Sequence, residues 1–126
     1  MANKIVGHAA KFNSRSLNLG GFVEVVAPGA FRRTLASGRD ILALHHHDSG
    51  QVLGRTSNGS LKLSEDDVGL RFEIDLPDTG LGRDTRELVR RQDIAGMSFG
   101  FSIRSADGED WHEEPSGLVV RTLRDI

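Results

Sequence analysis

The sequence predicts a mainly β fold with short helices, in the α+β class, and three observations support this prediction. Apolar and charged residues alternate with a period of two over 70–76, which is typical of a strand with one buried face. Several other short apolar segments are bounded by turn-forming residues. The chain also holds 15 glycines, and glycine is a residue that tight turns favour. Together these features favour a β-barrel or a sandwich whose connections carry the helices.

About six to eight strands are expected along the chain, each bounded by turn residues. The clearest turns are Ser57-Asn58-Gly59, Asp107-Gly108 before Trp111, and Pro115-Ser116-Gly117. The apolar run that begins at Asp40 is expected to be a buried strand with histidines at its end. The expected strands span residues 4–12, 22–26, 40–45, 51–56, 61–63, 70–76, 94–104 and 118–123.

Two short helices are expected in the connections. Pro28 stands where a helix over 28–36 would begin, and Ser37-Gly38 would end it. Asp84 can cap a second helix over 85–92, with Leu88 and Val89 facing inward.

Length and composition indicate one domain and argue against several classes of function. A chain of 126 residues is long enough for a core of its own. The net charge of −2 gives no basic excess for binding nucleic acid. The chain has no cysteine, which excludes disulfides, cysteine nucleophiles and thiolate metal sites. No segment has the length of a membrane span, and the N-terminus lacks an apolar signal core. We therefore expect a soluble intracellular protein.

Ser98 is the candidate nucleophile. It lies in Gly-Met-Ser-Phe-Gly-Phe at 96–101, within the expected strand over 94–104. Four bulky apolar side chains share one face of that strand, whereas Ser98 shares the other face with two glycines and another serine. If the core takes the bulky face, Ser98 has room for a substrate backbone beside it. The alternative is that the glycines give clearance to an element that crosses closely.

The candidate general base lies in Leu-His-His-His-Asp at 44–48. The carboxylate of Asp48 can fix the tautomer of His47 and raise its basicity, and a base that meets a distant serine in space is the minimum for acyl transfer. A second interpretation makes His45 and His47, which would share a strand face, metal ligands together with Asp48. The third is a solvated strand end with incidental histidines. Spacing alone leaves the three open.

Four arginines are further candidates, because a guanidinium beside a nucleophile can bind a substrate carboxylate or support an oxyanion. Each is also consistent with an ordinary surface charge. They are Arg90, Arg91, Arg121 and Arg124.

The chain resembles the prohead proteases of tailed bacteriophages, which are serine peptidases of capsid maturation related to herpesvirus assemblin. The resemblance runs in order through nearly the whole chain, so it is more specific than any single motif. The matching stretches include Gly-His-Ala-Ala-Lys-Phe-Asn-Ser at 7–14, Val-Leu-Gly-Arg-Thr at 52–56 and Gly-Met-Ser-Phe-Gly-Phe at 96–101, with others at 19–31, 47–48, 61–73, 76–79, 82–84 and 87–91.

The resemblance implies a fold, a mechanism and partners. The fold would be an assemblin-like β-barrel surrounded by helices, with residues 1–126 as a single core domain. The histidine of the family's His-Asp pair falls on His47 as general base, and the nucleophile falls on Ser98. Substrates would be segments of the scaffolding protein and the major capsid protein, cut inside the assembling prohead in the bacterial host cytoplasm. No metal or organic cofactor, no nucleic acid and no membrane are expected, and a homo-oligomer is possible in such a shell.

One departure from the family pattern bears on activity. Family members usually continue past the segment matched by residues 119–126, and the following strand carries the acid that orients the histidine. We therefore expect a chain truncated after Ile126, with Asp48 and Asp125 as the carboxylates left to substitute. Loss of the orienting acid can lower the rate by several powers of ten. A last strand without its neighbour would also leave a sheet edge uncovered and favour self-association. The alternative function is an inactive or non-enzymatic assembly protein of the same fold, which binds scaffold or shell protein.

Overall fold

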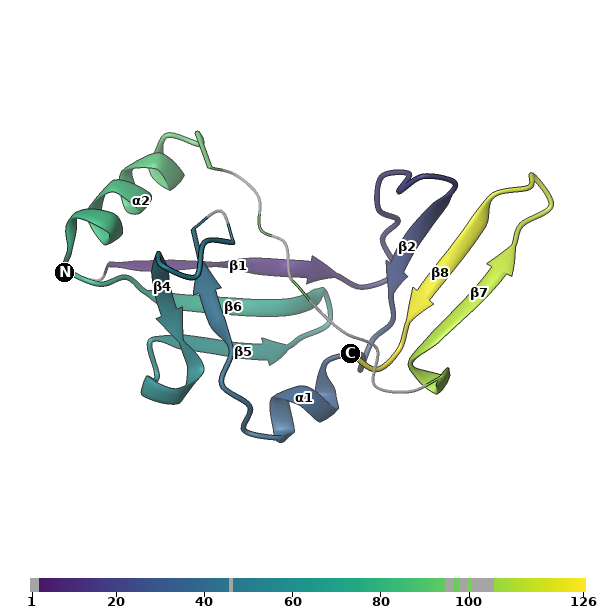
Figure 1. Ribbon diagram of the computed structural model, residues 1–126, viewed down its shortest axis with the longest axis horizontal. Helices are drawn as coiled ribbons and strands as arrows, with labels where there is room; N and C mark the ends of the chain where they lie inside the picture. Colours follow the sequence, from purple (N-terminus) through teal and green to yellow (C-terminus); the bar gives the residue numbers. More distant parts are fainter. Residues whose placement is uncertain (1–2, 46, 95–96, 98–99, 101–105) are drawn as a thin grey trace.

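A computed structural model describes residues 3–45, 47–94, 97, 100 and 106–126 of the chain (Figure 1). Over these residues the chain forms eight strands, two α-helices and two short 3-10 helices. None of the helices in the described ranges is long and apolar enough to cross a membrane. The elements are β1 (Lys4–Lys11), β2 (Phe22–Val26), α1 (Arg32–Ala36), β3 (Leu42–Leu44), β4 (Val52–Arg55), η1 (Thr56–Asn58), β5 (Leu61–Glu65), β6 (Gly69–Asp75), α2 (Gly80–Arg90), η2 (Ala106–Gly108), β7 (Glu109–Glu113) and β8 (Val119–Leu123).

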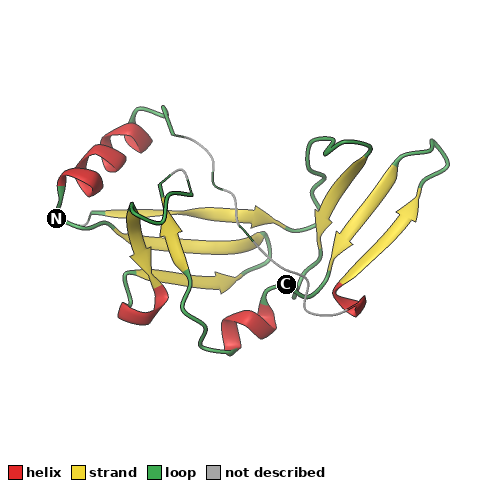
Figure 2. Ribbon diagram, viewed as in Figure 1, coloured by secondary structure: helices red, strands yellow, loops and turns green. Residues whose placement is uncertain are grey.

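The described strands form three separate sheets. One is antiparallel with the order β1-β6-β5, the second has the order β2-β8-β7, and the third is the hairpin β3-β4. Figure 2 shows the first two sheets as distinct groups of strands, joined by the connection from β1 to β2. The mainly β, α+β class is therefore confirmed. The strands of the described part do not close into a barrel.

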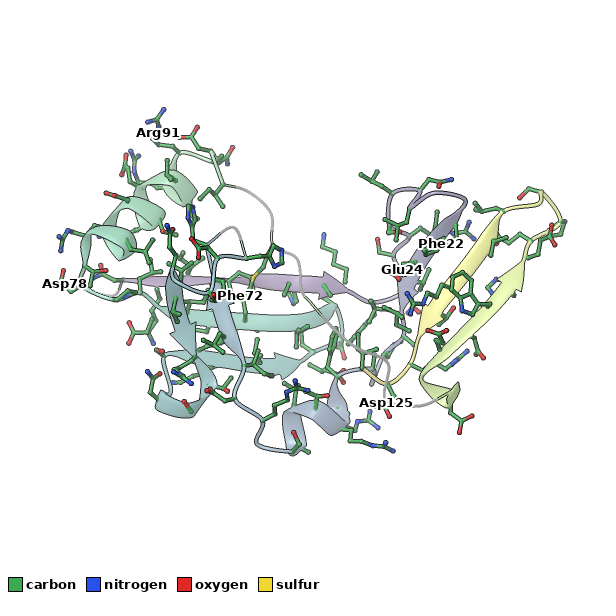
Figure 3. All side chains as sticks on the ribbon, in the orientation of Figure 1. Phe22, Glu24, Phe72, Asp78, Arg91 and Asp125 are labelled. Atoms are coloured by element: carbon green, nitrogen blue, oxygen red, sulfur yellow. The ribbon has the colours of Figure 1, made fainter. Side chains whose placement is uncertain are left out.

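The hydrophobic core lies against one face of β1-β6-β5. The inner strand β6 presents Leu70, Phe72 and Ile74 to it, all less than a tenth exposed, which confirms the alternation expected over 70–76. Figure 3 labels Phe72 on this strand. The neighbouring strands match this face, because Gly7 stands opposite Phe72 in β1 and Leu61 stands opposite Ile74 in β5. A side chain at Gly7 would meet the Phe72 ring, since a Cβ atom there would lie 3.1 Å from it.

The second sheet is attached to the core through the ends of β2 and β8. Val26 and Leu123 are both buried in the core cluster. The Ile126 amide donates to Ala30 O at 3.0 Å, and the Thr34 hydroxyl donates to Ile126 O at 2.7 Å. The end of β8 is thereby fixed beside α1.

Two strand expectations need correction. The run that begins at Asp40 gives only the three-residue β3, and Leu42 at its start is 41% exposed. β8 is the inner strand between β2 and β7, so the expected uncovered edge on the last strand is wrong. The expected strand over 94–104 lies largely outside the described residues.

Both helices begin at other residues than the sequence predicts. α1 begins at Arg32, because Pro28 opens a turn that precedes the helix. α2 begins at Gly80, five residues before the expected start at 85, and its cap is Thr79 in place of Asp84. The Thr79 hydroxyl accepts the Gly82 amide at 3.2 Å, which satisfies one of the free donors of the first turn. The first turn contains two glycines, and because glycine is a poor helix former the sequence pattern does not predict a helix there.

The first turn of α2 provides a matched test of packing. A Cβ atom at Gly82 would lie 1.9 Å from Pro77 O, whereas one at Gly80 would meet nothing within 4 Å. Gly82→Ala should therefore lower the free energy of unfolding by about 2 kcal/mol or more, as overpacking against backbone does. Gly80→Ala should leave it unchanged or raise it by up to about 1 kcal/mol. Urea unfolding of both variants measures the difference, and equal stabilities would contradict the packing of Pro77 on the helix.

Candidate active site

A large open cleft lies over the core face of the first sheet, and residues of β1, β5, β6, α1, β3 and the C-terminal end of α2 line it. Its volume is about 1520 Å³, which exceeds the roughly 300–1,000 Å³ typical of pockets for small ligands. His45 and His47 line it after β3. Met97 and Gly100, which flank the candidate nucleophile in the sequence, line it as well. The cleft therefore joins the two segments that sequence analysis selected.

The histidine segment is a tight loop between β3 and β4. The His45 amide donates to Gln51 O at 3.1 Å, and the Gln51 amide donates to Asp48 O at 2.9 Å. The His45 Nδ1 atom lies 2.9 Å from Gln51 Oε1. These bonds hold the loop at both ends. Because β3 ends at Leu44, the expectation that His45 and His47 share a strand face is wrong.

His47 is exposed and has an unusual backbone conformation. Its φ is +53°, in the left-handed region, which residues other than glycine adopt uncommonly and which asparagine, aspartate and histidine adopt more often than the others. Such conformations persist where the surrounding structure determines them, and they are concentrated at functional sites. The hydrogen bonds of the loop supply that constraint here, so His47 is presented in one orientation of its backbone.

Asp48 has a structural part in the same loop. Its Oδ1 atom accepts the Gly50 amide at 2.9 Å, and its own amide donates to His45 O at 3.0 Å. This carboxylate thus closes the turn that carries His47. Asp125, the other candidate acid, pairs with Arg33 on α1 at 3.0 Å, and Figure 3 shows it beside that helix.

Ser98 itself lies outside the described residues, as does most of the motif at 96–101. Met97 is 37% exposed, and it lines the cleft with Gly100. The expected contact between His47 and Ser98 therefore stays a prediction.

The four candidate arginines are all engaged in ion pairs, and none lines the cleft. Arg121 is the most elaborate case, because it pairs with Glu24 at 2.9 Å and with Glu109 at 2.6 Å on neighbouring strands. It also lies 5.5 Å from the centre of the Trp111 ring. The other pairs are Arg90 with Glu87, Arg91 with Asp93 and Arg124 with Asp110.

The metal interpretation finds no support in the described part of the chain. Within it, no group of three or more histidine, aspartate or glutamate side chains is arranged to hold a metal ion. His45, His47 and Asp48 belong to that part, and they do not form such a group.

A histidine–carboxylate pair that sequence analysis missed joins β1 to the turn before β6. The His8 Nε2 atom lies 2.8 Å from Asp66 Oδ2. The other oxygen of Asp66 accepts the Val68 and Gly69 amides, each at 2.9 Å. The bond from His8 and these two amides lower the pKa of the Asp66 carboxyl to about 2. No local motif could reveal this pair, because its members are 58 residues apart.

A second carboxylate, on the wall of the cleft, is held in a similar way. Asp40 lines the cleft and is bound by the Arg55 guanidinium from β4. That bond, together with the Ser57 amide, lowers the pKa of the Asp40 carboxyl to about 2. Asp40 therefore stays ionised through the neutral range, and its charge is compensated by a partner on the same hairpin.

Comparison with models of protein families finds a match along the chain. The model of a family described as caudovirus prohead serine protease matches residues 1–126, the full length of the chain. Neither the curated proteins nor the solved structures include a match.

The Asp66 pair makes a testable contribution to acid stability. Its folded-state pKa of about 2 lies below the roughly 3.9 expected when unfolded, so its contribution is present above about pH 4 and is lost as the pH falls toward 2. Asp66→Asn should unfold at lower urea concentration than the native chain at pH 6, and the difference should disappear near pH 2. Asp67→Asn, at the exposed neighbouring position, is the control and should match the native chain at both pH values. A difference for Asp66→Asn that is independent of pH would contradict the assignment.

Proposed function

Because the chain belongs to the caudovirus prohead serine protease family, we propose that it is a serine endopeptidase that cuts scaffolding and capsid-protein segments during prohead maturation. In this proposal Ser98 is the nucleophile and His47 is the general base. The observation that carries it is that His47 lines the same cleft as Met97 and Gly100, which lie on either side of Ser98 in the sequence. The match of the family model along the full chain supports the reaction class.

The proposed reaction is acyl transfer in two steps. The Ser98 oxygen attacks the scissile carbonyl while His47 accepts the hydroxyl proton, and His47 then gives this proton to the leaving amine. A water molecule, activated by the same imidazole, attacks the acyl-enzyme, releases the acid product and restores Ser98. The oxyanion of each tetrahedral intermediate requires hydrogen-bond donors. Since none of the four candidate arginines lines the cleft, we assign that part to backbone amides.

The loop that carries His47 suits the part of a general base. Its hydrogen bonds, the Asp48 turn among them, fix the backbone from which the imidazole projects. A fixed base reduces the entropy lost on reaching the transition state. The side chain is nevertheless exposed to the cleft, so a substrate can reach it.

The remaining parts of the proposal follow from the family. We propose that residues 1–126 act as one core domain with an assemblin-like barrel architecture. Its partners would be the scaffolding protein, the major capsid protein and other copies of the chain. Its place of action would be the assembling prohead inside the bacterial host.

Substitution of the two proposed catalytic residues tests the mechanism. With the scaffolding protein of the parent phage as substrate, Ser98→Ala and His47→Gln should each lower kcat/KM by about 10³-fold or more, because each removes a member of the proton-transfer pair. Fragment release followed by gel electrophoresis and mass spectrometry measures the effect.

The control is His112→Gln, which alters an exposed histidine on β7 and should cut at the native rate. Cleavage by Ser98→Ala at the native rate would show that another residue is the nucleophile. Binding of the scaffold without any cleavage by the native chain would favour the alternative of a non-enzymatic assembly protein.

A further inference from the structure

The second sheet carries an exposed aromatic side chain at a distance from the cleft. Trp111 on β7 is 50% exposed, and it is the single tryptophan of the chain. β7 lies at the opposite end of the molecule from α2 (Figure 1), and none of the residues of β2, β7 or β8 lines the cleft. Tryptophan is among the residue types enriched at the energetic centres of protein interfaces.

Three contacts fix the orientation of the indole ring. Its N–H group donates to Glu109 Oε1 at 2.9 Å. Its centre lies 5.0 Å from the centre of the Phe22 ring, in an edge-to-face arrangement. Figure 3 labels Phe22 on β2, and β8 lies between β2 and β7, so the indole ring must extend across β8. The Arg121 guanidinium of β8 lies 5.5 Å from the ring centre. One face of the ring is therefore over β8, and the other face is turned to solvent.

A ring held in this way is suited to binding. Because its position is already fixed, little conformational entropy is lost when a partner covers it. The face of an indole ring carries negative electrostatic potential and attracts cations, with guanidinium groups the most frequent. The exposed face of Trp111 is thus a place where the cation of a partner can stack.

An exposed carboxylate stands beside this ring. Glu113 is two residues from Trp111, so both side chains lie on the same face of the sheet. Glu113 stands opposite Val119, which stands opposite Phe22 on its other side, so the indole ring extends toward the row that holds Glu113. No described residue pairs with the Glu113 carboxylate, whereas the neighbouring acidic residues are all in ion pairs. These pairs are Glu109 with Arg121, Asp110 with Arg124 and Glu114 with Arg15.

The side chains around the ring have an excess of negative charge. We call this surface the Trp111 face, and its residues are Phe22, Glu24, Glu109, Trp111, Glu113 and Arg121. Arg121 pairs with both Glu24 and Glu109, so three carboxylates stand against one guanidinium. The bonds from Trp111 and Arg121 hold the pKa of the Glu109 carboxyl below its ordinary value, and it is ionised at neutral pH.

This charge selects the class of partner. A second copy of the chain presents the same excess of negative charge, so two Trp111 faces repel each other. Nucleic acid and anionic lipid are disfavoured for the same reason. A basic segment of another protein is attracted. Arginine suits the exposed ring better than lysine, because its planar guanidinium stacks on an aromatic face and binds a carboxylate at the same time.

We propose that the Trp111 face is a docking site for a basic segment of a partner protein, with an arginine of that segment stacked on the exposed face of the Trp111 ring and paired with Glu113. The site is separate from the cleft, so the inference goes beyond the proposed function and does not depend on it.

Trp111 itself reports on binding, because the chain has one tryptophan and no tyrosine. The probe is a synthetic peptide with blocked ends and two arginines among alanines. A matched peptide carries citrulline in place of both arginines, which keeps the shape of the side chain and removes its charge. We expect the arginine peptide to change the fluorescence of Trp111 with saturation. It should bind about fivefold or more tightly than the citrulline peptide, and sodium chloride should weaken it.

Two variants that each remove one carboxylate from β7 locate the contact. Glu113→Gln should weaken binding of the arginine peptide about three- to fivefold, as expected for one exposed ion pair, and should leave binding of the citrulline peptide unchanged. Asp110→Asn is the matched control, because Asp110 is exposed on the opposite face of the same strand. This variant should bind the arginine peptide with native affinity.

Several outcomes would overturn the inference. Equal affinities for the arginine and citrulline peptides would show that no cation is recognised. Equal effects of Glu113→Gln and Asp110→Asn would show that the charge acts from no particular face. Unchanged fluorescence of Trp111 at the highest soluble peptide concentration would exclude the site. Fluorescence that depends on protein concentration without peptide, together with a dimer in sedimentation velocity, would assign the Trp111 face to a second copy of the chain instead.

Discussion

The buried face of β6 is the constraint on which the rest of the structure depends. Leu70, Phe72 and Ile74 project from the inner strand of the first sheet into the core. Both neighbouring strands must therefore place small or apolar residues at the opposing positions, as Gly7 does for Phe72. A slip of one residue would turn every such side chain toward solvent. The same register fixes which residues of β1 face the core.

The cleft is assembled from segments that are far apart in the chain. β1 contributes residues 5–9, the loop after β3 contributes His47, and Met97 and Gly100 come from the segment after α2. The ladder to β6 holds β1, and the hydrogen bonds of its loop hold the backbone at His47. His47 has a left-handed backbone, and the hydrogen bonds of Asp48 and Gln51 that close the loop offset the cost of this conformation. The ion pairs of the second sheet, by contrast, lie outside the cleft.

Sequence patterns predicted the fold where a local rule decides it and failed where a distant contact does. The alternation over 70–76 identified β6, because its period reports one buried face. The start of α2 was missed, since Gly80 and Gly82 break the local helix rule and the fit against Pro77 requires the second of them. His47 was selected from its neighbours, but its place in a loop depends on bonds to Gln51. The His8–Asp66 pair carries no local signal, because its members are 58 residues apart in the sequence.

The parallel pairing of β2 with β8 bears on the order in which the chain folds as it is synthesised. Glu24 and Arg121, which bridge these strands, are 97 residues apart. β1 can pair as soon as β6 has left the ribosome, whereas β2 waits for its partner until β8 has emerged. Pairings of such high contact order form slowly, and a waiting strand is open to wrong partners. A charge on an edge discourages mispairing. Glu24 thus protects the nascent strand first and binds Arg121 afterwards.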